Sequence, residues 1–126
     1  LPGYPDNINL ASDGHYWLAL VGMRCPAYDL ALRMPGFRRR MAMRVPLDEW
    51  LFPNINTGCV LKFSDAGEVL ESFWDLGGEN HPMITSMREH RGHLYLGGIL
   101  NNRIGRYKLE GADPDFVQYD KRWGKA

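Results

Sequence analysis

Glu89-His90-Arg91-Gly92-His93-Leu94-Tyr95-Leu96-Gly97 is the stretch of sequence that decides the fold. Within it, residues 91–96 follow a pattern: a turn, Gly-His, two large residues and leucine. The same pattern occurs earlier, in Asp13-Gly14-His15-Tyr16-Trp17-Leu18. The two copies lie 78 residues apart, which exceeds the ~40–50 residues of common β repeats. An insertion at about 22–58 accounts for the excess. The sequence therefore indicates two copies of one β unit, with one interruption.

Short apolar or alternating segments, separated by turn signals, predict strands throughout this unit. Asp13-Gly14 is a two-residue hairpin signal, and Ser64-Asp65-Ala66-Gly67 is a second, longer one. The segments that they and other turns delimit are 7–10, 15–21, 59–63, 68–74, 85–89, 93–96 and 103–109. A propeller blade has four strands. We therefore predict an all-β fold over residues 1–109, a β-propeller portion of about two blades with four plus three strands.

The predicted insertion at 22–58 has helical rather than strand spacing. Its apolar residues lie three or four apart: Leu30, Met34, Phe37 and Met41. Pro35-Gly36 is expected to divide it into two short helices. Five arginines make the segment strongly basic: Arg33, Arg38, Arg39, Arg40 and Arg44. One interpretation is a solvated lid over the propeller. The other is a contact, made by Arg38, Arg39, Arg40 and Arg44, with an anionic membrane surface or an acidic partner.

Composition limits the classes of function. The chain has 126 residues, with 15 basic and 15 acidic side chains, so no general attraction to nucleic acid is expected. No run approaches the ~18 apolar residues of a membrane span, and no signal-peptide pattern is visible. The cellular compartment therefore stays open. Cys25 and Cys59 define no disulfide framework, and we expect free thiols. Residues 110–126 are expected to form a polar C-terminal tail.

Two blades cannot close a ring, because their flanks would present apolar sheet faces to water. Repeat units of this kind bury those faces against neighbouring units. We therefore expect the missing propeller blades, or self-association, to complete this chain.

Three segments resemble the strictosidine-synthase-like proteins: Pro5-Asp6-Asn7-Ile8, Ser12-Asp13-Gly14 followed by Trp17, and residues 89–97. That group includes the adipocyte plasma-membrane-associated protein. It is part of a six-bladed superfamily with the gluconolactonases, regucalcin and the paraoxonases. The resemblance implies that this chain matches the last two blades. It also implies that a strand from the N-terminal end completes the final blade, which would account for the eighth strand.

The resemblance implies two candidate sites. Asp6-Asn7 looks like the pair that binds the catalytic calcium in paraoxonase-like members, and calcium favours carboxylate and amide oxygens. Thr85 stands where strictosidine synthase has its acid–base glutamate. Threonine cannot act as a carboxylate base at neutral pH, so the condensation of an amine with an aldehyde is not expected. Without the resemblance, Asp-Asn is an ordinary turn former.

We therefore carry two main functional hypotheses. The first is a calcium-dependent hydrolase of esters or lactones, in which Asp6 and Asn7 bind the metal and the insertion covers a small-molecule pocket. The second is a non-catalytic or membrane-associated binding propeller. His81 and Thr85 are the candidate pocket residues, since each lies at the entry to a predicted inner strand. Catalytic residues stay unassigned.

Overall fold

The computed structural model describes residues 1–46, 49 and 56–118. One antiparallel sheet has the order β1 (Gly3–Leu10), β2 (Tyr16–Met23), β3 (Gly58–Phe63) and β4 (Val69–Asp75). A second has the order β5 (Ile84–His90), β6 (His93–Gly98) and β7 (Gly105–Lys108). The prediction of an all-β fold with four plus three strands is therefore confirmed. Among the described residues the two sheets form no closed barrel.

The turns form where the sequence places glycine. Gly14 in the β1–β2 hairpin has φ +86°, and Gly67 in the β3–β4 hairpin has φ +81°. Side-chain-bearing residues rarely adopt this left-handed conformation, whereas glycine adopts it at little cost. The two hairpins thus set the register of β1 with β2, where Leu10 lies opposite Tyr16, and of β3 with β4, where Phe63 lies opposite Val69.

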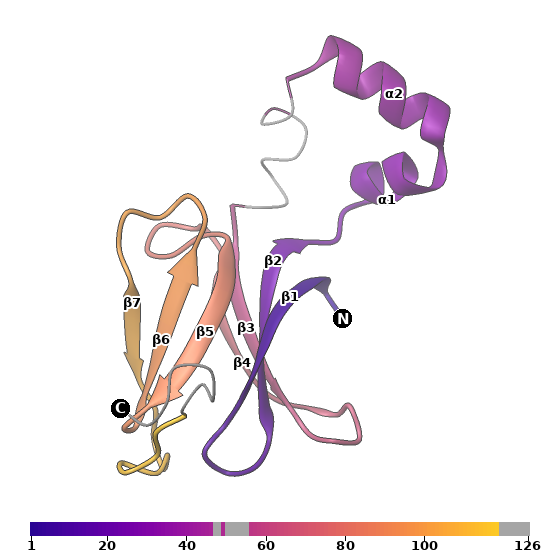
Figure 1. Ribbon diagram of the computed structural model, residues 1–126. Coiled ribbons are helices and arrows are strands. Elements are labelled where there is room, and N and C mark those ends of the chain that lie inside the picture. The colour runs from indigo at the N-terminus through magenta and orange to yellow at the C-terminus, as the bar shows by residue number, and fades with distance from the viewer. Residues whose placement is uncertain (47–48, 50–55, 119–126) are drawn as a thin grey trace.

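The main core lies between the two sheets. Successive residues of a strand point to opposite faces, so Trp17, Ala19 and Val60 face the second sheet, which contributes Met87 and Leu94. The intervening residues of β2 and β3 form a second cluster on the other face of the first sheet: Leu18, Leu20, Cys59 and Leu61. Figure 1 shows the two sheets side by side. At their junction, β1 and β2 of the first sheet contact β5 of the second.

A buried carboxylate joins the sheets at one end of this core. Glu89 of β5 is 1% exposed. One of its oxygens, Oε2, accepts a 2.7 Å hydrogen bond from Trp17 Nε1 and a 3.2 Å bond from the Ser12 backbone N–H. This contact therefore ties the two β units to each other.

The described part of the insertion contains the helices α1 (Pro26–Arg33) and α2 (Pro35–Arg44), which meet at Pro35 as predicted. Cys25 Sγ accepts a 3.4 Å hydrogen bond from the Tyr28 backbone N–H at the start of α1. Both cysteines are free, and burial raises the pKa of the Cys59 thiol to about 12. Among the described residues, neither helix is long and apolar enough to cross a membrane.

A polar contact fixes the base of the helical insertion to β1. Tyr4 Oη donates a 3.0 Å hydrogen bond to Asp29 Oδ1, and Arg24 Nη2 lies 2.9 Å from Asp29 Oδ2. The rings of Tyr4 and Tyr28 meet edge to face, with their centroids 4.9 Å apart. Beyond this contact, α1 and α2 project away from both sheets (Figure 1). The insertion therefore begins at the end of the sheet where β1 starts.

The outer faces of the two sheets differ in polarity. The outer face of the first sheet exposes several large apolar side chains: Ile8, Leu10, Val69 and Trp74. The outer face of the second sheet presents Arg88, Tyr95 and Arg106, which lie opposite one another across its strands. The predicted apolar flank is therefore present on the first sheet, whereas the second sheet has a largely polar flank.

Candidate functional site

Asp6 and Asn7 lie within β1, at a β-bulge, and not in a turn that precedes a strand. Pro5 lies opposite Leu20 and Ile8 opposite Leu18, so the β1 segment has one residue more than its partner. A bulge re-aims side chains that would otherwise alternate between the two faces, and bulges are common beside functional sites. Here Asn7 Nδ2 donates a 3.1 Å hydrogen bond to Asp6 Oδ1. The two exposed side chains therefore lie side by side.

The second sheet has a bulge at the equivalent position. Ile84 lies opposite Gly98 and Ser86 opposite Gly97, which leaves Thr85 as the extra residue. Asn7 Nδ2 donates a 2.7 Å hydrogen bond to the Thr85 carbonyl oxygen. The structure thus brings Asp6, Asn7 and Thr85 together.

The distance along the chain between Asn7 and Thr85 equals the offset of the sequence repeat. Asn7 and Thr85 are 78 residues apart, as are Asn9 and Met87. Asn9 Nδ2 donates a 2.6 Å hydrogen bond to the Met87 carbonyl oxygen. The inner strands β1 and β5 therefore meet at equivalent residues, through side-chain amides that bond to backbone carbonyls.

This arrangement leaves oxygen atoms available. The Asn7 amide nitrogen is used by both Asp6 and Thr85, so the Asn7 Oδ1 and the second oxygen of Asp6 are the remaining acceptors. Carboxylate and amide oxygens suit calcium, which takes six to eight oxygen ligands. Within the described part of the chain, no group of three or more His, Cys, Asp or Glu side chains is placed to hold a metal. Asp6 and Asn7 therefore fit a calcium site as a minority of its ligands.

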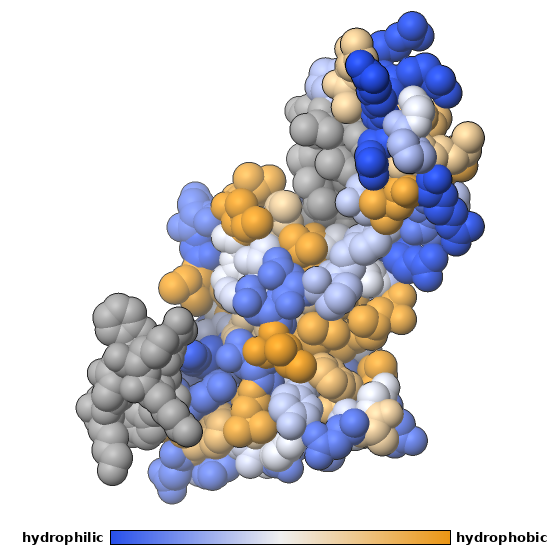
Figure 2. Space-filling view, turned by 45° about the vertical axis from the view of Figure 1, so that its right-hand side comes forward, coloured by the Kyte–Doolittle hydropathy of each residue, from blue (hydrophilic) through white to orange (hydrophobic). Residues whose placement is uncertain are grey.

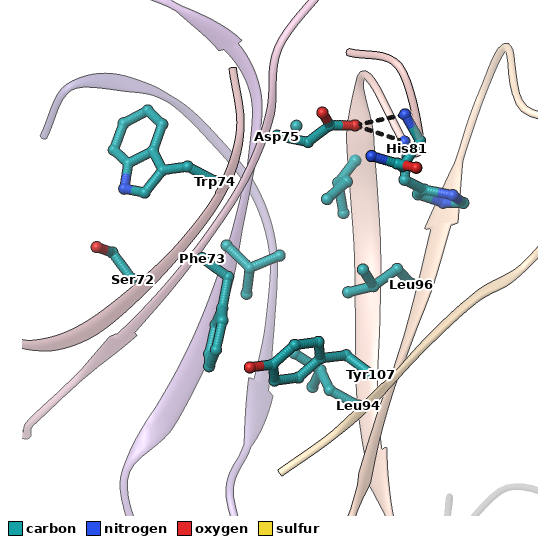
Figure 3. Close-up of a pocket in the computed structure, with 12 residues that line it drawn as sticks. Ser72, Phe73, Trp74, Asp75, His81, Leu94, Leu96 and Tyr107 are labelled. Carbon is teal, nitrogen blue, oxygen red and sulfur yellow. Dashed lines mark hydrogen bonds between the residues drawn. The ribbon is translucent and has the colours of Figure 1, made fainter. Parts of the chain in front are cut away.

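His81 lies elsewhere, at a cavity of about 400 Å³ between the sheets (Figure 3). Figure 3 shows Phe73, Leu94, Leu96 and Tyr107 directed into this space, whereas Ser72 and Trp74 point away. The ring centroids of Phe73 and Tyr107 are 4.8 Å apart. The cavity therefore has mainly apolar walls.

Asp75 holds the loop that carries His81. One oxygen, Asp75 Oδ2, accepts hydrogen bonds from the backbone N–H groups of Asn80 and His81, at 2.8 and 2.7 Å. These bonds lower the pKa of the Asp75 carboxyl. His81 is 6% exposed, and burial lowers the pKa of its imidazole, with a contribution from the nearby Arg103 charge. His81 is therefore an uncharged side chain at neutral pH, on a loop fixed by Asp75.

The candidate residues therefore occupy three separate places. Asn7 lines a shallow depression of about 470 Å³ that also includes Ser86 and Arg88 but not His81. Arg38, Arg39, Arg40 and Arg44 are exposed on α2. Sequence reasoning missed the two bulges and the bond between Glu89 and Trp17. The repeat offset of 78 residues was the available signal for the two matching bulges, because it already aligns Asn7 with Thr85.

Comparisons with known proteins give one consistent group of relatives. Over 114 residues the chain is 32% identical to protein strictosidine synthase-like 10 of Arabidopsis thaliana, and the match covers 86% of this chain and 30% of that protein. The adipocyte plasma membrane-associated protein of Bos taurus is 31% identical over 113 residues, which cover 86% of this chain and 27% of the relative.

The human adipocyte plasma membrane-associated protein is 31% identical over 114 residues, with 87% of this chain and 27% of the relative covered. No family model and no solved structure matches the chain. The chain thus spans about three tenths of the length of the curated relatives it matches. Together with the two-sheet fold, these matches confirm the resemblance seen in the sequence: over the matched region, the chain belongs to the strictosidine-synthase-like family that includes the adipocyte plasma membrane-associated proteins.

Proposed function

We propose that this chain is part of a calcium-dependent hydrolase of esters or lactones. The observation that supports the proposal is the pair of matching bulges, which places Asp6 beside Asn7 and holds Asn7 against Thr85. Two neighbouring oxygen donors of different charge at the junction of the inner strands are suited to a hard cation. The other ligands and the substrate-contacting groups would come from outside the described residues.

The residues of this chain would act as a fixed platform. The hydrogen bonds from Asn7 Nδ2 to the Thr85 carbonyl and to Asp6 Oδ1 orient the amide and leave Asn7 Oδ1 and the second Asp6 oxygen as acceptors. A bound calcium ion would polarise a substrate carbonyl and stabilise the developing oxyanion. Asp6 would supply negative charge to the site and Asn7 a neutral ligand. The helical insertion, attached to β1 through Tyr4, would border the same end of the sheet.

Strictosidine-synthase-type condensation is disfavoured because the bulge in β5 carries Thr85. Its hydroxyl has no pKa in the range needed for a general base at neutral pH. Thr85→Glu would restore a carboxylate there, but a single carboxylate does not supply the rest of a condensing pocket, so we expect no condensation of tryptamine with an aldehyde in either form. Condensation by the unmodified protein would contradict the hydrolase proposal.

Removing the charge of Asp6 tests the metal site. If calcium at 100 times its dissociation constant binds only the folded protein, it stabilises that state by ~2.7 kcal/mol, which raises the melting temperature by about 10 °C. Asp6→Asn should remove most of this rise, because calcium affinity depends on the number of charged ligands. It should also lower calcium-dependent hydrolysis of aryl esters. Thermal scanning with and without calcium measures the first effect.

Asp115→Asn is the matched control, since Asp115 is an exposed carboxylate in the turn after β7. This variant should keep the full calcium response. Equal responses of the two variants, or no response of the unmodified protein, would contradict a calcium site at Asp6-Asn7.

Asn7→Asp separates the metal role from the structural role. A carboxylate cannot donate to the Thr85 carbonyl, and it would repel Asp6. We expect a loss of about 1–3 kcal/mol in unfolding free energy together with altered calcium binding. Asn9→Asp removes the equivalent bond to Met87. It should cost similar stability in denaturant titrations and leave calcium binding unchanged. A calcium defect of the same size in Asn9→Asp would show that Asn7 acts only through the contact between strands.

A further inference from the structure

The helical insertion, residues 26–44, concentrates positive charge in one part of the molecule. Five of the 15 basic residues of the chain lie between residues 33 and 44, with no acidic residue among them. Because the whole chain has 15 acidic residues and no net charge, the remainder carries a net excess of five negative charges. The electrostatic field of this protein therefore has a positive end at the helices and a negative end at the sheets.

The arginines of α2 are free to meet a partner. Arg38, Arg39, Arg40 and Arg44 are all exposed. The ion pairs in the described part of the chain join Arg24 to Asp29 and Lys62 to Asp13, so they use none of these four. Figure 2 shows strongly hydrophilic side chains gathered on the part of the molecule that projects from the sheets. Their guanidinium groups can therefore pair with external anions such as phosphates.

Apolar side chains lie exposed among these arginines. Met43 of α2 is 75% exposed, Leu32 of α1 is 47% exposed and Met34 between the helices is 49% exposed. Such side chains gain free energy when they enter the boundary between lipid headgroups and acyl chains. Surfaces that bind single-stranded nucleic acid instead use exposed aromatic rings to stack bases, whereas Phe37, the aromatic residue of α2, is half-buried. The combination favours a lipid surface over single-stranded nucleic acid.

We infer that α1 and α2 form a peripheral docking arm for an anionic phospholipid surface. The four arginines of α2 contact headgroup phosphates, and Met43 and its apolar neighbours enter the interface. The excess negative charge of the sheets is repelled from the same surface, so the arm approaches first. The salt bridge between Arg24 and Asp29 and the hydrogen bond from Tyr4 then hold the sheets at a fixed position relative to the surface. This inference is independent of the proposed calcium site.

Vesicle sedimentation of the intact protein tests the inference. We expect binding to vesicles that contain 30% phosphatidylserine in phosphatidylcholine, and little binding to phosphatidylcholine alone. Each arginine near an anionic surface contributes a roughly fivefold gain in affinity. The triple variant Arg38→Gln, Arg39→Gln, Arg40→Gln should therefore bind about 100-fold more weakly. Raising the salt concentration should weaken binding of the unmodified protein, because salt screens these contacts.

The matched control removes three exposed positive charges from the second sheet, by Arg88→Gln, Arg106→Gln and Lys108→Gln. It has the same net charge as the arginine variant and should bind as the unmodified protein does. Met43→Ser should weaken binding several-fold. Leu76→Ser, at a site that is also 75% exposed, should not.

Several outcomes would overturn the inference. Equal binding by the two charge variants would mean that net charge, and not the arm, drives adsorption. Equal binding to neutral and anionic vesicles would exclude headgroup charge as the determinant. Tighter binding to a short duplex DNA or to polyglutamate than to anionic vesicles, lost in the arginine variant, would assign the arm to a nucleic acid or to an acidic protein instead.

Discussion

Trp17→Ala is expected to lower the unfolding free energy by about 3–5 kcal/mol, as truncation of a fully buried large side chain does. Trp17 is 1% exposed and lies between the two sheets, where its ring contacts Phe73 at a centroid distance of 5.8 Å. Its loss also removes the 2.7 Å bond to Glu89. A buried carboxylate that loses a hydrogen-bond donor adds to the cost. Urea titration followed by circular dichroism measures the change.

Two further variants make this result interpretable. Trp74→Ala, at a site 42% exposed on the outer face of the first sheet, should cost no more than about 1 kcal/mol. Trp17→Phe keeps an aromatic ring but removes the donor to Glu89, and should cost about 1–3 kcal/mol. If Trp17→Ala and Trp74→Ala shifted the midpoint equally, the core would not lie between the sheets.

The second large effect concerns the apolar outer face of the first sheet. We expect the isolated chain to self-associate through this face, because large apolar patches on soluble proteins mark interaction surfaces. Full burial of a large apolar side chain contributes ~1.5–3 kcal/mol. The double variant Leu10→Lys, Trp74→Lys should therefore weaken association at least a hundredfold. Analytical ultracentrifugation over a range of protein concentrations measures this.

Ile99→Lys with Leu100→Lys is the control, since both residues are about two-thirds exposed in the loop after β6. This pair should leave association unchanged. A monomeric unmodified chain, or an equal effect of the control, would contradict self-association through the first sheet.

The strands were predictable because local signals agree with the tertiary structure. Asp13-Gly14 and the loop that ends at Gly67 fix two hairpins, and the alternation that follows each turn fixes the register. Pro35 likewise predicts where α1 ends and α2 begins, because the residue before a proline is disfavoured in a helix. These features depend on residues close together in the sequence.

The geometry of the candidate site was not predictable in the same way. A bulge depends on how two strands pair, so the sequence around Asp6 does not reveal that its side chain lies beside that of Asn7. The bond between Glu89 and Trp17 spans 72 residues. Glu89 was visible only as the first residue of the segment 89–97 that carries the family resemblance. Its burial and its partner follow from the packing of one sheet on the other.

The spacing between the sheets has a geometric consequence for ring size. The inner strands are close enough for Asn7 and Asn9 to reach backbone carbonyls of β5, whereas further out the sheets meet through the rings of Phe73 of β4 and Tyr107 of β7, beside the cavity. Two neighbouring sectors of a ring must diverge by a fixed angle, and the number of sectors is the full circle divided by that angle. Short hydrogen bonds from the asparagine side chains near the centre, and bulky aromatic rings toward the rim, together set the angle between the two sheets. In a closed propeller, the sizes of Phe73 and Tyr107 would therefore help to set how many blades fit into one ring.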